Sequence, residues 1–320
     1  MQNKKGLKKM GMLKQTDLTF AELQQQYIKK CQVNNLSEYT IKFYNVSCRM
    51  FGKFIDITEL KVSEINRDLI DDYILHLKEQ ELKDITINTY VRGISPIIKH
   101  GMSLGIVKIF GFKEIKTTEE IKDVYNDEEL KILLKKPDMS SFTEYRNWAL
   151  ISFLLGTGVR ALELRNVKIK DIDLKSSMLI VRRTKSRRQR YVPISKSLNK
   201  ILNEYLEYRK HETDEEFLFC NEFGEYMPRT TLQGAITKYC KRRGIKKYSI
   251  HLFRHTFAKK WILNRGDIFS LQKILGHTSL KMVNHYSNLY AEDLKQNYDS
   301  FCALESVVDN EKSRIKIEKD

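Results

Sequence analysis

The spacing of apolar and polar positions over roughly the first hundred residues predicts a small unit built of helices. Thr19-Phe-Ala-Glu22 is a capping-box signature, and it opens a helix that we expect to run to about Val33. Ser37 begins a second helix, because the positions after it are apolar at helical spacing. Two further helical patterns cover residues 66–80 and 86–104.

After residue 125 the patterns predict a second unit that combines helices with a small sheet. Asn126 and the acidic residues after it are typical of a helix start. Residues 148–157 are almost wholly apolar, which predicts a buried helix. Short β-rich runs separated by polar turns follow, and the sequence after them is mainly helical. The β-rich runs are residues 171–174, 178–182 and 191–194.

A chain of 320 residues is long enough for two domains. We expect a mainly α protein with a small antiparallel β-sheet, in which an all-α N-terminal domain precedes an α+β domain. Residues 108–124 lack clean periodicity, so we interpret them as a linker. The predicted divisions are a flexible basic arm (1–16), the helical domain (17–107), the linker (108–124), the α+β domain (125–300) and a charged C-terminal tail (301–320).

The charge balance predicts a polyanionic partner. The chain has 57 Lys and Arg against 41 Asp and Glu, a net charge of +16. Neutralising phosphates releases condensed counterions, which favours binding to nucleic acid. An anionic membrane surface is a second option, but no long basic amphipathic segment supports it. A basic protein without such a partner is the third. Of these, we favour nucleic acid.

Four features favour a soluble, cytoplasmic protein. The chain contains no run of eighteen apolar residues, so the sequence predicts no membrane span. The basic start lacks the apolar segment of a secretory signal. Mean hydropathy is −0.47. The cysteines are odd in number and form no CxxC, which argues against a disulfide or zinc framework. They are Cys31, Cys48, Cys220, Cys240 and Cys302.

The stretch from His251 to Tyr286 contains the residue types that phosphodiester transfer needs. Tyrosine can attack a phosphodiester and hold it covalently. Arginine binds two phosphate oxygens and stays charged at any working pH, and fixed cationic donors stabilise the transition state. Arg254 and His277 are candidate donors, and His251 is a candidate for proton transfer.

Two segments upstream offer further candidates. Arg160 follows a Gly-Thr-Gly break after the apolar helix, and Glu163 lies on the same face if the segment is helical. A solvent-exposed Arg–Glu pair is the alternative reading. Four cations of the basic tip between the last two β-rich runs are candidates, and composition alone does not choose among them. These cations are Lys185, Arg187, Arg188 and Arg190.

The order and spacing of these segments resemble the tyrosine recombinases, a family that includes phage integrases and Xer-type enzymes. The resemblance covers about residues 17–300. It implies an α+β catalytic domain and an N-terminal domain that binds core-site DNA. The segments that carry it are Gly156-Thr-Gly-Val-Arg160-Ala-Leu-Glu163, Lys185 in the hairpin, His251-Leu-Phe-Arg254-His255, and Leu275-Gly-His277 followed by Tyr286.

The resemblance implies a nucleophile. Tyr286, nine residues after His277, would attack the scissile phosphate and leave a 3′-phosphotyrosyl link and a free 5′-hydroxyl. The covalent link stores the bond energy, so neither a cofactor nor ATP or a metal is implied. Tyr290 and Tyr298 are the neighbouring alternatives.

It also implies roles for the cationic residues. Arg160 and Arg254 would clamp the non-bridging oxygens, and His277 would hydrogen-bond one of them. Lys185, eight residues before Pro193, would be the general acid for the leaving 5′-oxygen.

The remaining candidates support these residues. His251 would accept or relay the proton of the nucleophile. Glu163 would support Arg160, and His255 would be a structural residue beside the site. The other hairpin cations would contact DNA phosphates without sequence preference. They are Arg187, Arg188 and Arg190.

Family resemblance also implies the assembly. We expect a homotetramer on two duplexes, acting through a Holliday junction at double-stranded core sites, with an accessory or directionality factor as a further partner. About sixteen residues precede the first helix, so we expect no separate arm-binding domain. Integration or excision of a mobile element is the expected role, with Xer-like dimer resolution or DNA inversion as the alternative.

Two functions of other classes are alternatives to a recombinase. A type IB topoisomerase shares the chemistry, but we do not expect it to have the Leu-Gly-His-Thr context. A DNA-binding protein without activity is a second alternative, yet every expected active-site position is filled. His251 and His255 have the spacing of a zinc-protease helix, but Leu252 stands where that motif needs glutamate. We therefore expect no metal site.

Overall fold

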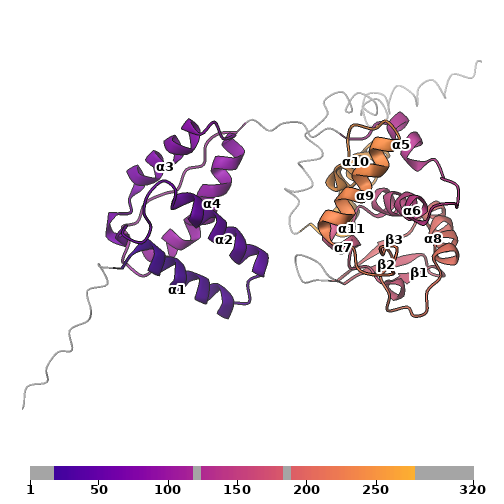
Figure 1. The fold of residues 1–320 in the computed structure, drawn as a ribbon, viewed down its shortest axis with the longest axis horizontal. Coiled ribbons are helices and arrows are strands. Elements are labelled where there is room, and N and C mark those ends of the chain that lie inside the picture. Colours follow the sequence, from indigo (N-terminus) through magenta and orange to yellow (C-terminus); the bar gives the residue numbers. More distant parts are fainter. Residues whose placement is uncertain (1–17, 118–123, 183–188, 278–320) are drawn as a thin grey trace, which may run out of the picture. The chain divides into compact units, whose positions relative to one another are not determined.

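The computed structural model describes residues 18–117, 124–182 and 189–277, and the chain divides into two compact units, residues 1–120 and 121–320 (Figure 1). The division lies inside the segment predicted as a linker. Within the described residues, helices dominate and one small antiparallel sheet is present, as the sequence predicts. None of the described helices is long and apolar enough to cross a membrane.

The described part of the N-terminal unit consists of four α-helices and a short 3-10 helix. The predicted capping box is present: the Thr19 side chain accepts a hydrogen bond from the Glu22 amide, and the Glu22 carboxylate accepts one from Thr19. Ser37 caps the second helix by its side chain alone, which accepts a hydrogen bond from the Thr40 amide. The elements are α1 (Phe20–Val33), α2 (Glu38–Phe51), η2 (Val62–Glu64), α3 (Arg67–Glu79) and α4 (Asp84–Ser103).

Aromatic rings and a close helix pair form the core of this unit. The Phe51 ring packs against Phe20 and Tyr73, with centroid distances of 5.1 and 4.9 Å. Helices α2 and α4 approach so closely that a Cβ atom at Gly93 would lie 1.9 Å from the Ser47 hydroxyl oxygen. The two helices therefore depend on glycine at this crossing.

The chain after α4 continues to pack on the N-terminal unit. The Asn88 side chain donates to the Ile115 carbonyl and accepts from its amide, both at 2.9 Å. Phe110 and Phe112 pack against the same core. The sequence predicts a linker from residue 108, but residues 108–117 are in neither a helix nor a strand, so helical periodicity gives no sign of their packing.

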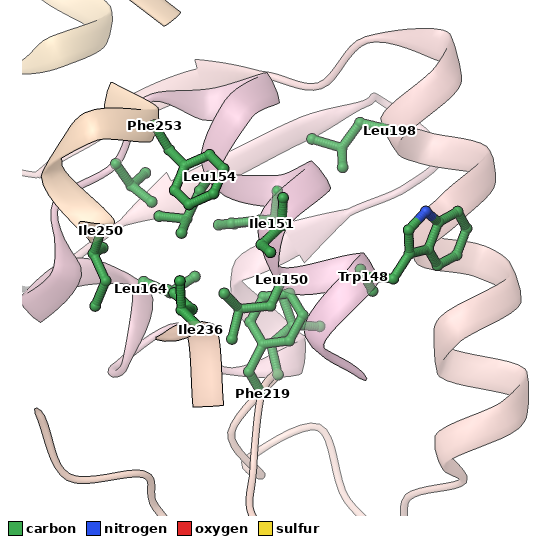
Figure 2. Close-up of a cluster of buried hydrophobic side chains, with 14 of the residues drawn as sticks. Trp148, Leu150, Ile151, Leu154, Leu164, Leu198, Phe219, Ile236, Ile250 and Phe253 are labelled. Carbon is green, nitrogen blue, oxygen red and sulfur yellow. The ribbon is translucent and has the colours of Figure 1, made fainter. Parts of the chain in front are cut away.

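Helix α6 (Phe142–Thr157) is the centre of the C-terminal unit. In Figure 2 its side chains Leu150, Ile151 and Leu154 lie among side chains from surrounding elements, including Ile236 and Phe253. The helix begins before the apolar run from which the sequence predicts it. Its first turns bury polar residues, so the apolar pattern does not mark its start. The other helices among the described residues of this unit are α5 (Asp127–Leu134), α7 (Ala161–Leu164), η3 (Ile169–Asp171), α8 (Lys196–Arg209), α9 (Arg229–Arg242), α10 (Ile250–Leu263) and α11 (Ile268–Leu275).

The sheet has three antiparallel strands in the order β1-β2-β3. Leu179 and Val192 are paired across β2 and β3, and both are buried against the core. Val181 pairs with Arg190, so Arg190 begins the last strand. The strands are β1 (Ile172–Asp173), β2 (Met178–Val181) and β3 (Arg190–Pro193).

Candidate active site

Three successive carbonyl groups at the end of α11 each accept a hydrogen bond from a different arginine. The last carbonyls of a helix lack partners within the helix and carry its negative dipole end, so they attract cations. Gly276 ends the helix in the left-handed conformation, with φ of 64°. The hydrogen bonds join Arg190 Nε to Ile274 O (2.7 Å), Arg254 Nη2 to Leu275 O (2.9 Å) and Arg160 Nη2 to Gly276 O (3.1 Å).

Arg160 reaches this point because α6 stops abruptly. Gly158 ends α6 in the left-handed conformation, with φ of 61°. A Cβ atom there would lie 2.6 Å from the Phe257 ring, so the turn requires glycine for both reasons. Arg160 then stands at the N-cap of α7, with 23% of its side chain exposed. Its side chain is therefore held in a partly exposed position.

Glu163 joins two of the arginines. Its side chain is 1% exposed, and its carboxylate accepts from Arg160 Nη1 at 3.0 Å and from the Arg160 amide at 2.8 Å. Arg190 binds both oxygens of the same carboxylate, at 2.9 and 2.8 Å. Burial raises the pKa of Glu163, but Arg190 and Arg160 outweigh it and hold the pKa below its usual value. Glu163 is therefore an ionised partner of two arginines.

Arg254 is buried in α10, with an exposure of 5%. Its Nη1 donates to the Gly158 carbonyl at 2.6 Å, and its Nη2 lies 2.8 Å from His277 Nε2. It thereby links the end of α6 to the turn after α11. The same helix carries His251 in its first turn, where the residue is exposed, and His255 one turn later, where it is half-buried.

The contact with Arg254 defines the protonation state of His277. A guanidinium can only donate, so Nε2 must be the acceptor, and the proton of the neutral ring is on Nδ1. Burial lowers the pKa of His277 to about 4, and the charges of Arg254, Arg160 and Arg190 act in the same direction. At neutral pH the ring is therefore an uncharged hydrogen-bonding group.

The structure thus brings five of the predicted residues into one cluster: Arg160, Glu163, Arg190, Arg254 and His277. His251 and His255 lie on the helix that carries Arg254. The remaining predicted residues are outside the described part of the chain. They are Lys185, Arg187, Arg188 and Tyr286.

Arg190 has partners that the sequence reasoning did not anticipate. We predicted a DNA phosphate contact for it, but its described hydrogen bonds are to Glu163 and Ile274, and 10% of its side chain is exposed. The signal was strand alternation: Arg190 and Val192 lie two residues apart in one strand and share a face. Since the apolar Val192 must point to the core, Arg190 should point inward too.

The cluster is suited to an anion that carries concentrated charge. It combines three guanidiniums with one carboxylate, so it has an excess of positive charge at a partly exposed position. All of these donors are fixed by hydrogen bonds before any ligand binds. Preorganised donors of this kind stabilise charge that develops on a phosphoryl group during transfer.

Two family models together match most of the chain. The sequence model described as the Phage integrase family matches residues 123–293. That described as the Phage integrase SAM-like domain matches residues 7–119. The fold and the site define a DNA strand-transferring enzyme of this class, and the chain belongs to the tyrosine recombinase family.

Individual relatives cover most of the chain. The tyrosine recombinase XerC of Oceanobacillus iheyensis is 27% identical over 275 residues, which are 82% of this chain and 90% of that protein. Among solved structures, the Tn1549 transposon integrase in complex with transposon right end DNA has a TM-score of 0.72 and 20% identity, covering 89% and 100% of the two chains. The XerH recombinase bound to a palindromic difH substrate has a TM-score of 0.69 and 21% identity, covering 88% and 84%.

Proposed function

We propose that this chain is a site-specific recombinase, or integrase, that cleaves and rejoins DNA through a 3′-phosphotyrosine intermediate and a Holliday junction. The observation that carries the proposal is the convergence of Arg160 and Arg254 on neighbouring carbonyls beside His277. Two fixed guanidiniums next to a neutral hydrogen-bonding ring suit the oxygens of a phosphoryl group in transfer.

In the proposed first step, Tyr286 Oη attacks the phosphorus. A tyrosyl O–P bond forms and the bond between phosphorus and the 5′-oxygen breaks. The tyrosine proton passes to or through His251, and Lys185 supplies a proton to the departing 5′-oxygen. Arg160 and Arg254 hold the non-bridging oxygens while their negative charge increases. One P–O bond replaces another, so the step is balanced without ATP or a redox partner.

The second step reverses the chemistry of the first, but the attacking hydroxyl belongs to a different DNA strand. The 5′-hydroxyl of the partner duplex attacks the phosphotyrosine, and the tyrosine leaves with a proton. Exchange of one strand pair and then the other requires four active sites on two duplexes, so we propose a homotetramer with a Holliday junction as its intermediate. The N-terminal unit would bind the core site, assisted by an accessory or directionality factor.

Integration and excision of a mobile element is the biological role that we propose. The chain would act in the cytoplasm of a bacterium, on the DNA of the nucleoid. The similarity in fold to a transposon integrase supports this role. Resolution of replicon dimers, or DNA inversion, is the second candidate, and it is supported by the XerC relatives.

A nicked suicide substrate tests the reaction. The duplex that the chain binds is first selected from random duplexes, and a nick beside the cleavage position then lets the short fragment that carries the released 5′-hydroxyl diffuse away. The wild-type chain should accumulate a covalent protein–DNA product, with EDTA present. Tyr286→Phe should form none, because the tyrosine oxygen is the nucleophile.

Three results would contradict the proposal. They are an unchanged yield in Tyr286→Phe, a requirement for Mg²⁺, and loss of product in Tyr290→Phe with retention in Tyr286→Phe. Two differently labelled duplexes separate the recombinase from a topoisomerase. A recombinase should join their strands, whereas a type IB topoisomerase should only relax supercoils.

A further inference from the structure

We infer that Arg190 is a positioning residue for strand transfer, which holds Arg160 and the turn of His277 in place instead of binding a DNA phosphate. The inference rests on the proposed function. Arg190 enters from β3, whereas Arg160 comes from the N-cap of α7 and His277 follows α11. Arg190 is therefore the contact through which the sheet supports the cluster.

The first support is the shared carboxylate. Arg190 binds Glu163 through two parallel hydrogen bonds, which leaves Arg160 with one side-chain contact to that carboxylate. The second amino group of Arg160 is then directed to Gly276 O. Without Arg190, the buried charge of Glu163 would face Arg160 alone and draw its guanidinium into a bidentate pair. Such a pair would turn Arg160 away from the phosphate.

The second support is charge. Glu163 carries one negative charge and contacts two arginines. If only Arg160 were present, the pair would be neutral and would stabilise less well the negative charge that develops on the phosphoryl group during transfer. Arg190 compensates the carboxylate and leaves the charge of Arg160 available for an anion. The role needs no contact between Arg190 and DNA.

The third support is packing on the turn before His277. A Cβ atom at Gly276 would lie 3.1 Å from both Cδ and Nη1 of Arg190. The guanidinium therefore lies directly against the Gly276 backbone, while Nε donates to Ile274 O. Arg190 fixes this turn from one side and Arg254 fixes it from the other, through Leu275 O.

Arg190→Gln tests the inference by separating binding from cleavage. At saturating DNA, cleavage of the nicked substrate should fall about 100-fold, which is what a 1 Å displacement of a catalytic group costs. The dissociation constant for the duplex and its salt dependence should not change. A phosphate-binding arginine would instead weaken binding and reduce the salt slope by about 1, with normal cleavage at saturation. That result would overturn the inference.

A methylphosphonate at the scissile position distinguishes positioning from general loss of structure. The methyl group replaces one charged oxygen, so the need for the cation at that oxygen is relieved. The ratio of methylphosphonate to phosphate cleavage should rise in Arg160→Ala. We expect it to rise in Arg190→Gln as well, with the same diastereomer. This ratio is independent of the folded fraction, because both rates scale with it.

Arg182→Gln is the matched control. Arg182 follows the neighbouring strand and also pairs with a buried carboxylate, that of Asp171, but its described contacts do not include the cluster. Its rate ratio should equal that of the wild type. Arg190→Lys keeps one charge but cannot bind both carboxylate oxygens, so it should recover part of the rate.

The outcomes separate the two proposals. If the wild-type chain forms no covalent product, the proposed function fails. If the wild type cleaves and Arg190→Gln has the wild-type rate, or a low rate without a change in the methylphosphonate ratio, only the role of Arg190 fails.

Discussion

The N-terminal unit buries apolar side chains and three uncharged polar residues, whereas the C-terminal unit also buries four charged residues within the described part of the chain. Burying a charge costs free energy unless the charge is paired and hydrogen-bonded. The uncharged residues are Ser47, Asn88 and Ser95, and the charged residues are Arg146, Glu163, Asp171 and Arg254.

The difference indicates where the chemistry lies. Each of the four described buried charges of the C-terminal unit is paired or hydrogen-bonded, and two of them, Glu163 and Arg254, belong to the cluster around α11. An apolar core of the N-terminal kind would be simpler to fold. A core with fixed charges provides donors that are already oriented when a phosphate arrives. We therefore expect substitutions in the two units to affect different measurements.

Arg254→Ala should have the largest effect. Binding to the duplex should survive, but cleavage at saturating DNA should fall about 100- to 1,000-fold, as for loss of one preorganised donor to a transition-state anion. Single-turnover cleavage and fluorescence anisotropy measure the two quantities. Arg146→Ala is the control, because Arg146 is equally buried but contacts Cys220 O and Asn147. Equal losses of binding and cleavage in Arg254→Ala would make it a phosphate anchor.

Glu163→Gln should destabilise the C-terminal unit by about 3 kcal/mol, since it leaves two arginines without their buried carboxylate. Both tryptophans of the chain, Trp148 and Trp261, lie in this unit, so urea unfolding followed by tryptophan fluorescence reports on it. Glu215→Gln removes an exposed partner of two lysines and should leave the midpoint unchanged. Equal midpoints for Glu163→Gln and the wild type would show that the cluster contributes nothing to folding.

His277 should make the stability of the C-terminal unit depend on pH. Burial lowers the pKa of the folded ring from 6.5 to about 4. As the pH falls through this window, the unfolded chain binds a proton that the folded chain does not, so the unfolding free energy decreases. The decrease should be about 1–2 kcal/mol for a half-buried ring, and it should be absent in His277→Gln. Parallel curves for the two proteins between pH 6.5 and 4 would contradict the assigned state of His277.

Tyr73→Phe should have the smallest effect, and in the N-terminal unit. The Tyr73 hydroxyl is buried and has no hydrogen-bond partner among the described residues, so its removal should stabilise the unit by about 1 kcal/mol. Circular dichroism should detect the change, while tryptophan fluorescence and cleavage should not. Tyr125→Phe is the matched change in the C-terminal unit. It removes a donor to Lys247 O and should destabilise that unit.

The sequence predicts local structure in both units well. The Thr19–Glu22 capping box and the Ser37 cap depend on residues three apart, so they can be read from the chain itself. The start of α6 could not be read in this way. Arg146 and Asn147 are polar but buried, and the partner that satisfies Arg146 is a carbonyl 74 residues away.

The candidate site shows the same division. Arg160 and Glu163 are neighbours on one turn, and their pairing follows from spacing. Arg190 binds Glu163 from 27 residues further along the chain. The hydrogen bonds from arginines to the carbonyls at the end of α11 form only in the tertiary structure, so sequence spacing does not predict them. Binary patterning does carry one clue, the shared face of Arg190 and Val192.

Peptide mapping of the covalent protein–DNA product tests strand transfer by this chain most directly. The wild-type chain is incubated with the nicked duplex, digested with trypsin and nuclease, and analysed by mass spectrometry. We predict that the nucleotide is attached to Tyr286 through its 3′-phosphate. Attachment to another residue, or through a 5′-phosphate, would contradict the proposed chemistry.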